Sequence, residues 1–353
     1  MPPLLERLGV EVPVVQAGMG GGLSRHELAA AVSEAGGLGT IAVNGAAAIR
    51  RELAAARALT GRPLAVNVLL PFARREWFEA AAEADVVVTF WGRPRRRTGG
   101  VWMHQCGSVG EAQRAWAAGA DAVIVQGVEA GGHVRGTEPA LQLLEQVRAA
   151  LPRHYPLLLA GGIAGRDDVR AALEAGASAA VAGTRFLLSE ESRAHPEYKR
   201  RLLGAEATVL TDLFGAGWPA AHRVVPNAAT ERWLGSAGAP EPGGASKSRR
   251  RSSFYGLFRP KDERQLGGGL RRAPRANRAL NHLMAPGTRY LPSSLQQRLI
   301  VAQRPGSRVL TPATPIDDGP ESLVEAGPLY AGETVARIEA LRPAADLVRE
   351  LAG

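Results

Sequence analysis

Residues 121–136 read Asp-Ala-Val-Ile-Val-Gln-Gly-Val-Glu-Ala-Gly-Gly-His-Val-Arg-Gly, and this stretch is the most informative one about the fold class. Its first half, Ala122–Val125, is apolar and mostly β-branched, as expected of a strand buried on both faces within a parallel sheet. Its second half holds four glycines, which let the backbone approach a ligand without obstruction by a Cβ atom. A buried strand that opens into such a loop at its carboxyl end is typical of the active face of an α/β barrel.

His133 follows the pair Gly131-Gly132 in this loop and is our first candidate for a catalytic residue. A plain surface-loop histidine is the alternative. The position at the end of a buried strand, beside the glycine pair, favours a functional role, because barrels carry their chemistry there.

The pattern of a short apolar run followed by an alanine-rich amphipathic segment repeats along the first half of the chain. It predicts eight strands, at Val12–Gln16, Leu38–Val43, Pro63–Leu69, Asp85–Phe90, Val101–Cys106, Ala120–Gln126, Leu157–Ala160 and Ala177–Ala182. Helices are predicted between most of them, with Ser24 and Ser108 as N-caps of capping boxes completed by Glu27 and Glu111. Residues 92–100 are too few for a helix.

Eight such strands, nearly all ending in glycine, predict a (β/α)8 TIM barrel. A doubly wound open sheet is the alternative. That fold would show one glycine fingerprint after the first strand and an acidic residue at the end of the second, and the run Gly18–Gly22 lacks these partners.

The barrel is expected to occupy residues 1–225. A helical lid or insertion after strand eight is expected over residues 226–326, with short helices at Ala276–Met284 and Ser293–Gln303, because long structureless loops are rare without a function. Within it, the basic segment 235–275 is expected to be disordered. Residues 327–353 are expected to supply a C-terminal helix, Glu333–Leu351, that packs back on the barrel.

The net charge of +9 comes from one segment. Between Lys247 and Arg278, eleven Lys and Arg residues against two acids leave +9, which equals the charge of the whole chain. The segment is rich in Gly, Ser and Pro, so we interpret it as a solvated insertion that does not favour nucleic acid as a partner. An anionic protein partner is the alternative.

The single cysteine, Cys106, excludes an internal disulfide and a cysteine-based metal site. It favours a reducing, cytoplasmic setting. No apolar run approaches the length of a membrane span, and no signal peptide is expected at the N-terminus.

The loops after the seventh and eighth predicted strands carry Gly161, Gly162, Gly183 and Thr184. In barrels these two loops often bind a phosphate through backbone N–H groups and a helix N-terminus. Two tight turns that happen to contain glycine are the alternative. No Lys-Ser/Thr pair follows either loop, so nucleotide hydrolysis is not supported.

The other strand ends offer neutral groups, with few acids and no paired carboxylates. They are Met19, Asn67, Thr89, Gln105, Gln126 and His133. Such a set suits a flat, polar heterocycle, and no His/Asp/Glu cluster has the spacing of metal ligands.

This arrangement resembles the nitronate monooxygenase family of FMN-bound barrels, most specifically in Gln126-Gly127-x-Glu129-Ala130-Gly131-Gly132-His133. The resemblance implies FMN held by Ala17, Gly18, Met19, Asn67, Gln105, Gln126, Gly131 and Gly132, with its phosphate on Gly161, Gly162, Gly183 and Thr184. It implies that His133 is the active-site histidine. Gln105 stands where the family usually has a lysine or a similar group.

The resemblance implies that an alkyl nitronate gives one electron to FMN, forming a flavin semiquinone, and that dioxygen completes its conversion to a carbonyl compound and nitrite. His133 would bind the nitro oxygens, or act as a base if neutral nitroalkanes are substrates. An NAD(P)H-dependent reductase acting on a quinone or an enoyl thioester is the main alternative. A non-catalytic flavin-binding protein is the second alternative. The sequence leaves the oligomeric state open between a monomer and a homodimer.

Overall fold

The computed structural model describes residues 3–235, 269–284 and 293–353. Eight parallel strands form the first sheet, in the order β1-β9-β8-β6-β5-β4-β3-β2. They are β1 (Val14–Gln16), β2 (Gly39–Ile41), β3 (Leu64–Leu69), β4 (Val86–Phe90), β5 (Val101–Cys106), β6 (Ala122–Gln126), β8 (Leu157–Ala160) and β9 (Ala179–Ala182). A parallel bridge between Val15 and Leu38 joins the two edge strands and closes the sheet. The predicted (β/α)8 barrel is therefore confirmed.

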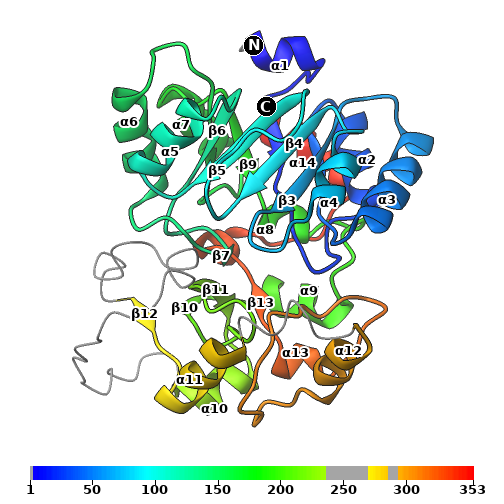
Figure 1. Cartoon of the computed structure of the whole chain (residues 1–353), viewed down its shortest axis with the longest axis vertical. Coiled ribbons are helices and arrows are strands. Elements are labelled where there is room, and N and C mark those ends of the chain that lie inside the picture. Colours follow the sequence, from blue (N-terminus) through cyan, green and yellow to red (C-terminus); the bar gives the residue numbers. More distant parts are fainter. Residues whose placement is uncertain (1–2, 236–268, 285–292) are drawn as a thin grey trace.

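Helices pack on the outside of the barrel (Figure 1). They are α2 (His26–Glu34), α3 (Ala46–Leu59), α4 (Arg75–Ala81), α5 (Val109–Ala117), α6 (Ala140–Ala150), α7 (Arg166–Glu174), α8 (Thr184–Leu187) and α14 (Ala344–Ala352). The short helix α1 (Pro3–Leu8) places Leu4 and Leu5 in the same apolar cluster as the barrel interior. Helix α1 thereby closes the amino-terminal end of the barrel, and the carboxyl end is left for ligands.

The period-two alternation of the strands decides which side chains reach that carboxyl end. Val15, Ala65, Met103, Ile124 and Val181 belong to the interior cluster. Two residues further along each of these strands, on the same face, lie Ala17, Asn67, Gln105, Gln126 and Gly183. The geometry of the strands thus brings these five candidate site residues to one end of the barrel.

No helix separates β4 from β5, as the short connection predicted. A hydrogen-bonded cluster covers the outer face of these strands instead. The Trp102 indole N–H donates to Thr89 Oγ1 at 2.7 Å, and the Thr89 hydroxyl lies 2.8 Å from Nδ1 of His104. Thr89, which the sequence placed among the ligand-facing groups, therefore has a structural role on the outside of the barrel.

A second, smaller sheet lies beneath the carboxyl ends of the barrel strands (Figure 1). Its strands are β12 (Leu270–Arg271), β10 (Val209–Thr211), β11 (His222–Val225) and β13 (Leu329–Tyr330), and β7 (Gly132–His133) pairs with β11. Helices α9 (Pro196–Leu203), α10 (Ala228–Leu234), α11 (Arg275–Met284), α12 (Ser293–Ala302) and α13 (Leu323–Ala326) surround it. The sequence predicted α11 and α12 but not α10, α13 or the strands, because strands of two to four residues are too short to show a period.

Strands β10 and β11 precede residue 226, where the insertion was expected to begin. Most of the segment 235–275, expected to be disordered, lies outside the described residues. Its described end contributes β12 and the start of α11. No helix in the described part of the chain combines the length and the apolar character that a membrane span requires.

One of the two predicted N-caps was wrong. The other was correctly placed, but its capping box is incomplete, because Glu111 Oε2 accepts from the Gly107 N–H and not from that of Ser108. Ser24 does not cap α2: it is buried, accepts a hydrogen bond from Gln16 Nε2 at 2.9 Å and donates to the Thr40 carbonyl. Ser108 does cap α5, accepting from the Glu111 N–H at 3.4 Å. The side chain of a serine satisfies a buried backbone group as well as it caps a helix, so sequence alone did not separate the two cases.

The predicted helix Glu333–Leu351 is two elements. Residues Glu333–Arg337 form a 3-10 turn, and α14 begins only after Pro343, because proline disrupts a helix interior but suits its first turn. Leu347, Val348 and Leu351 of α14 are buried in the cluster between the barrel and its helices. The end of the chain therefore packs on the barrel.

Gly39→Ala tests the packing of β2 on α2. A Cβ atom at Gly39 would overlap the carbonyl of Ala29, which is backbone and cannot yield easily. We expect Gly39→Ala to lower the free energy of unfolding by about 1–3 kcal/mol, seen as a lower Tm in a thermal melt. The control Gly61→Ala, where a Cβ meets nothing within 4 Å, should leave Tm almost unchanged, and equal effects of the two variants would contradict this account.

Candidate functional site

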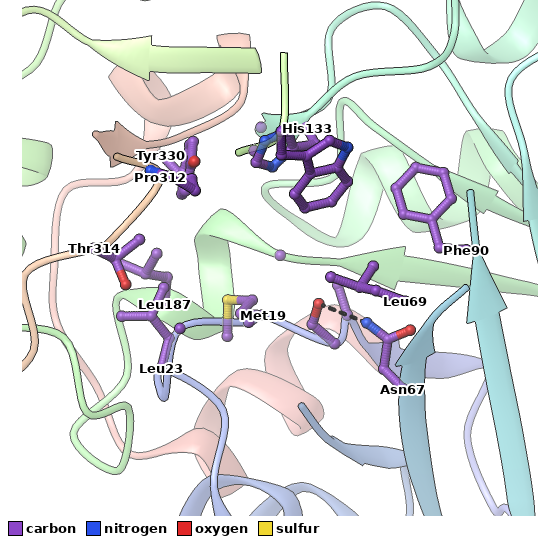
Figure 2. A pocket seen from close by; sticks show the side chains of 18 of the residues that line it. Met19, Leu23, Asn67, Leu69, Phe90, His133, Leu187, Pro312, Thr314 and Tyr330 are labelled. Atoms are coloured by element: carbon purple, nitrogen blue, oxygen red, sulfur yellow. Dashed lines mark hydrogen bonds between the residues drawn. The ribbon is translucent and has the colours of Figure 1, made fainter. Parts of the chain in front are cut away.

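A cavity of about 1040 Å³ opens between the carboxyl ends of the barrel strands and the insertion. The thirteen residues proposed from the sequence as catalytic or FMN-binding line it, and Figure 2 shows Met19, Asn67 and His133 among them. The thirteen are Ala17, Gly18, Met19, Asn67, Gln105, Gln126, Gly131, Gly132, His133, Gly161, Gly162, Gly183 and Thr184. The structure thus brings together every one of them, and their individual roles stay predictions.

The cavity wall is almost free of charge. Among the lining residues that the structure describes, Arg74 is the one charged side chain and none is a carboxylate. Arg74 is exposed and forms no ion pair with another described residue. In the described part of the chain, a group with the proximity of metal ligands occurs only at His26, Glu27 and Glu52, which do not line the cavity.

Asn67 faces Gly18 at the end of β3 (Figure 2). Its amide N–H donates to the Gly18 carbonyl at 3.3 Å, while its Oδ1 is buried without a hydrogen-bond partner. A Cβ at residue 18 would lie 2.5 Å from the Cβ of Asn67, so this position requires glycine. A buried amide oxygen without a partner is costly, and it suits an N–H donor on a ligand.

The ends of β8 and β9 form a cradle of backbone N–H groups. Gly161 and Gly162 have φ angles of 107° and 77°, which side-chain-bearing residues rarely adopt. The N–H groups of Gly161, Gly162 and Gly183 donate to no acceptor among the described residues. Thr184 Oγ1 accepts from the Gly332 N–H at 2.9 Å, which ties the cradle to the C-terminal segment. The arrangement suits an anion.

The side chain of Gln126 holds the loop that follows β6. Its Nε2 donates to the His133 carbonyl at 3.1 Å, and its Oε1 accepts from the Arg135 N–H at 2.9 Å. Gly131 is needed for the same loop, because a Cβ there would lie 2.5 Å from the carbonyl carbon of Ala331. Gln126 therefore uses one N–H donor and one acceptor site of its amide within the chain.

His133 lies among aromatic rings. Its imidazole stacks on Trp218, with centroids 3.6 Å apart and an interplanar angle of 11°, and the Tyr330 ring lies 5.5 Å away. Neither ring nitrogen has a hydrogen-bond partner among the described residues, and Nε2 is buried. Burial, and to a lesser extent His222, lowers the pKa of His133 well below its ordinary value. The imidazole is therefore neutral at pH 7.

His222, paired with His133 across β11 and β7, is held by the backbone. Its Nδ1 lies 2.9 Å from the Ala220 carbonyl, and its Nε2 accepts from the Phe214 N–H at 3.2 Å. Burial lowers the pKa of His222 to about 4. His222 is therefore neutral and places no positive charge beside His133.

Trp91 supports this aromatic cluster from the barrel side. Its ring lies 5.4 Å from Trp218, and the Arg135 guanidinium lies 4.7 Å from its ring centroid. Its φ of 63° is in the left-handed region, which no other non-glycine residue adopts in the described ranges. Such a conformation is costly for a bulky side chain, so the surrounding packing must maintain it.

Sequence reasoning missed the cavity residues that come from segments beyond the last barrel strand. They include Trp218, Leu299, Ile300, Thr314 and Tyr330. No local pattern marks them, since none follows a barrel strand. A glycine-rich context, Gly215–Gly217 before Trp218 and Gly327 and Gly332 around Tyr330, was the one available signal.

Fold and cavity together define a (β/α)8-barrel enzyme whose ligand site lies at the carboxyl ends of its strands. The model of the family described as nitronate monooxygenase matches residues 2–86 and 93–240. The chain belongs to this family of flavin-dependent oxidoreductases.

Individual relatives agree with this assignment. The chain is 37% identical over 262 residues to a nitronate monooxygenase of Pseudomonas aeruginosa, covering 58% of this chain and 74% of the relative. It is 35% identical over 243 residues to a (3aS,4S,5R,7aS)-5-hydroxy-7a-methyl-1-oxo-octahydro-1H-indene-4-carboxyl-CoA dehydrogenase of Mycobacterium tuberculosis, covering 63% and 65% of the two chains.

Solved structures share the fold over nearly the whole chain. FabK from Thermotoga maritima has a TM-score of 0.71 at 24% identity, covering 99% of this chain and 94% of its own. A nitroalkane oxidase from Streptomyces ansochromogenes has a TM-score of 0.65 at 27% identity, covering 99% and 96%.

The lowered pKa values of the buried histidines allow us to predict how the free energy of unfolding depends on pH. Burial lowers the pKa of both His104 and His222 to about 4, whereas an unfolded histidine titrates near about 6.5. Between these values the unfolded chain binds more protons than the folded one. These groups should therefore lower the free energy of unfolding progressively as pH falls from about 6.5 to about 4.

Thermal melts between pH 4.5 and 7.5 measure this dependence. His104→Asn, which removes one titrating group, should make the decline of Tm with falling pH shallower. The control His154→Asn changes an exposed histidine and should leave the slope as it is in the unaltered chain. An unaltered slope in His104→Asn would contradict the assignment.

Proposed function

We propose that this chain oxidises nitronates, using FMN and dioxygen, to a carbonyl compound and nitrite. The observation that carries the proposal is the imidazole of His133, which lines the cavity and whose buried Nε2 has no hydrogen-bond partner among the described residues. The nitronate monooxygenase relatives and the nitroalkane oxidase support the same reaction class.

The residues around the cavity fit FMN. The unpartnered Oδ1 of Asn67 suits an N–H group of the flavin ring, and the free N–H groups of Gly161, Gly162 and Gly183 suit its phosphate. Ala17, Gly18, Met19 and Gln105 would line the ring, with Thr184 at the phosphate. When bound, FMN supplies the electron acceptor that passes electrons from the substrate to dioxygen.

The chain's own residues have a limited chemical task. A nitronate is already an anion, so no strong base is needed to generate it. Neutral His133 would donate one N–H to a nitronate oxygen, and the Tyr330 hydroxyl and the Trp218 indole N–H, both buried without partners, are further donors at the same cavity. Donors held in a site with little water stabilise negative charge more than they would in solution.

Rings on several sides of His133 would keep water from the reacting atoms. Trp218 covers one face of the imidazole. The Trp91 ring is nearly perpendicular to the imidazole, and the centroids of these two rings lie 6.5 Å apart. Exclusion of water limits competing hydrolysis and protonation.

The sequence also favoured a cytoplasmic location for this protein, and that location stays a prediction.

Anaerobic mixing tests the reaction. Propionate 3-nitronate should bleach the flavin absorbance of the purified protein, whereas NADH and NADPH should not. Bleaching by a pyridine nucleotide alone would mean a reductase and overturn the proposal. His133→Ala should retain the flavin spectrum and lower kcat/KM for the nitronate about 100-fold, the usual scale for one charge-stabilising donor. The exposed His154→Ala serves as the control.

Gly183→Leu tests the phosphate cradle. A Cβ at residue 183 makes only an ordinary contact of 3.7 Å with Ala17, so the fold should tolerate the change while the side chain fills the cradle. Quenching of FMN fluorescence by the apoprotein should show affinity lowered about 10- to 100-fold, since a hydrogen bond to a charged group is worth about 1.5–3 kcal/mol. Gly165→Leu, where a Cβ meets nothing within 4 Å, should bind FMN normally. Full affinity in Gly183→Leu would remove the phosphate assignment.

A further inference from the structure

Arg135, two residues after His133, forms a buried ion pair that the proposed reaction does not use. Its guanidinium pairs with Glu111 in the first turn of α5, and its Nε donates to Oε1 of Glu111 at 2.5 Å. The two side chains are only 11% and 13% exposed. Burying two charges costs desolvation energy that their attraction barely offsets, so stability alone does not explain this pair.

Backbone groups anchor both members of the pair. The other carboxylate oxygen of Glu111 accepts from the Gly107 N–H at 2.9 Å, and the Arg135 N–H donates to the side-chain oxygen of Gln126 at 2.9 Å. A Cβ at residue 107 would overlap the Arg135 carbonyl carbon, so the end of β5 and this loop are in direct contact. The guanidinium is therefore held in one place between β5, α5 and the loop.

The Arg135 guanidinium lies over the ring of Trp91, 4.7 Å from its centroid. Trp91 is 1% exposed, and its indole N–H is buried without a partner among the described residues. Its φ of 63° is costly for a bulky side chain. Because no hydrogen bond from the indole to a described residue fixes it, ring packing and the cation must hold it, and such a cation is attracted most strongly when it is desolvated.

Trp91 connects this cation to the candidate site. Its ring stands at 88° to that of His133 and at 78° to that of Trp218, with centroids 6.5 Å and 5.4 Å away. Trp218 in turn stacks on the imidazole. Since the buried Nε2 of His133 has no hydrogen-bond partner among the described residues, these two indole rings set the orientation of the imidazole.

The same three residue types meet a second time, at Arg96. Its guanidinium lies 2.8 Å from Asp121 and 5.7 Å from the ring centroid of Trp102. Arg96, Asp121 and Trp102 are not among the described residues that line the cavity, and Trp102 contacts neither His133 nor Trp218 among the described ring pairs. Arg96 therefore provides a matched control for Arg135.

We propose that Arg135 is a positioning residue that fixes the ring of Trp91 and, through it, the orientation of the His133 imidazole. Glu111 holds the guanidinium in place, and Trp218 completes the contact on the cavity side. Arg135 is not one of the described residues that line the cavity, so it does not act on the substrate directly. Its effect on turnover rests on the proposed function, whereas its effect on the imidazole does not.

Turnover of propionate 3-nitronate by the flavin-loaded full chain is the first measurement. Arg135→Met keeps the length of the side chain without its charge. It should lower kcat/KM about tenfold and change the Kd for FMN less than about twofold, because a small displacement of a group at the reacting atoms slows the reaction without emptying the cofactor site. Arg135→Lys keeps a cation for the ring and should stay within about threefold of the unaltered chain. Arg96→Met should have no effect.

An NMR measurement on the same proteins needs no reaction. Stacking on Trp218 should displace the ring-proton signal of His133 from the ordinary histidine position, and the loss of this signal in His133→Ala assigns it. Arg135→Met should move the signal toward the ordinary position, while Arg135→Lys moves it less and Arg96→Met leaves it unchanged. A signal that moves in this way in a chain that oxidises no nitronate would support the inference and overturn only the proposed function.

Trp91→Leu tests whether Arg135 acts through the ring. In that background Arg135→Met should cause no further loss of kcat/KM and no further movement of the His133 signal, because changes that remove the same contact are not additive. Equal effects of Arg135→Met with and without Trp91 would overturn the proposal. So would an unmoved His133 signal, an equal effect of Arg96→Met, or a loss of bound FMN that accounts for the whole fall in activity. If Trp91→Leu does not fold, the His133 signal in Arg135→Met and Arg135→Lys decides the question.

Discussion

The antiparallel pairing of β7 with β11 is the contact on which the site depends. It sets His133 opposite His222, and the Val134 N–H donates to the Ala221 carbonyl at 2.9 Å just beyond it. On its other side the same loop is held by the Gln126 amide. Backbone hydrogen bonds on both sides fix a loop far better than side-chain packing alone. The barrel and the insertion therefore share one strand pair, and the imidazole lies at that junction.

The small number of charges among the described lining residues follows from this construction. The residues that lie beside His133 from the second sheet and its connections are aromatic, and their burial keeps both His133 and His222 neutral. A cationic imidazole would bind an anionic substrate more strongly, but it would have to be desolvated first. A neutral donor beside buried, unpartnered Trp218 and Tyr330 groups avoids that cost and still meets the anion with hydrogen bonds.

The strand-end residues could be predicted to lie together for a geometrical reason. In a closed parallel barrel the strand period and the common strand direction place Ala17, Asn67, Gln105, Gln126 and Gly183 at one end, so their meeting was predictable before any contact was known. Thr89 is the one strand-end residue whose predicted position was wrong. It lies on the opposite face of β4 from Val88, and it forms hydrogen bonds with Trp102 and His104 on the outside of the barrel, where no helix covers the strands.

The barrel, its strands, the glycine cradle and the position of His133 were predictable from the sequence, because each depends on local periodicity and on residues that follow a strand. The surroundings of His133 depend on the tertiary structure. Trp218 and Tyr330 come from segments 85 and 197 residues further along the chain, and very short strands and ring packing bring them to the imidazole. Such non-local contacts leave no periodic signal, since their partners are fixed by the fold and not by their neighbours in sequence.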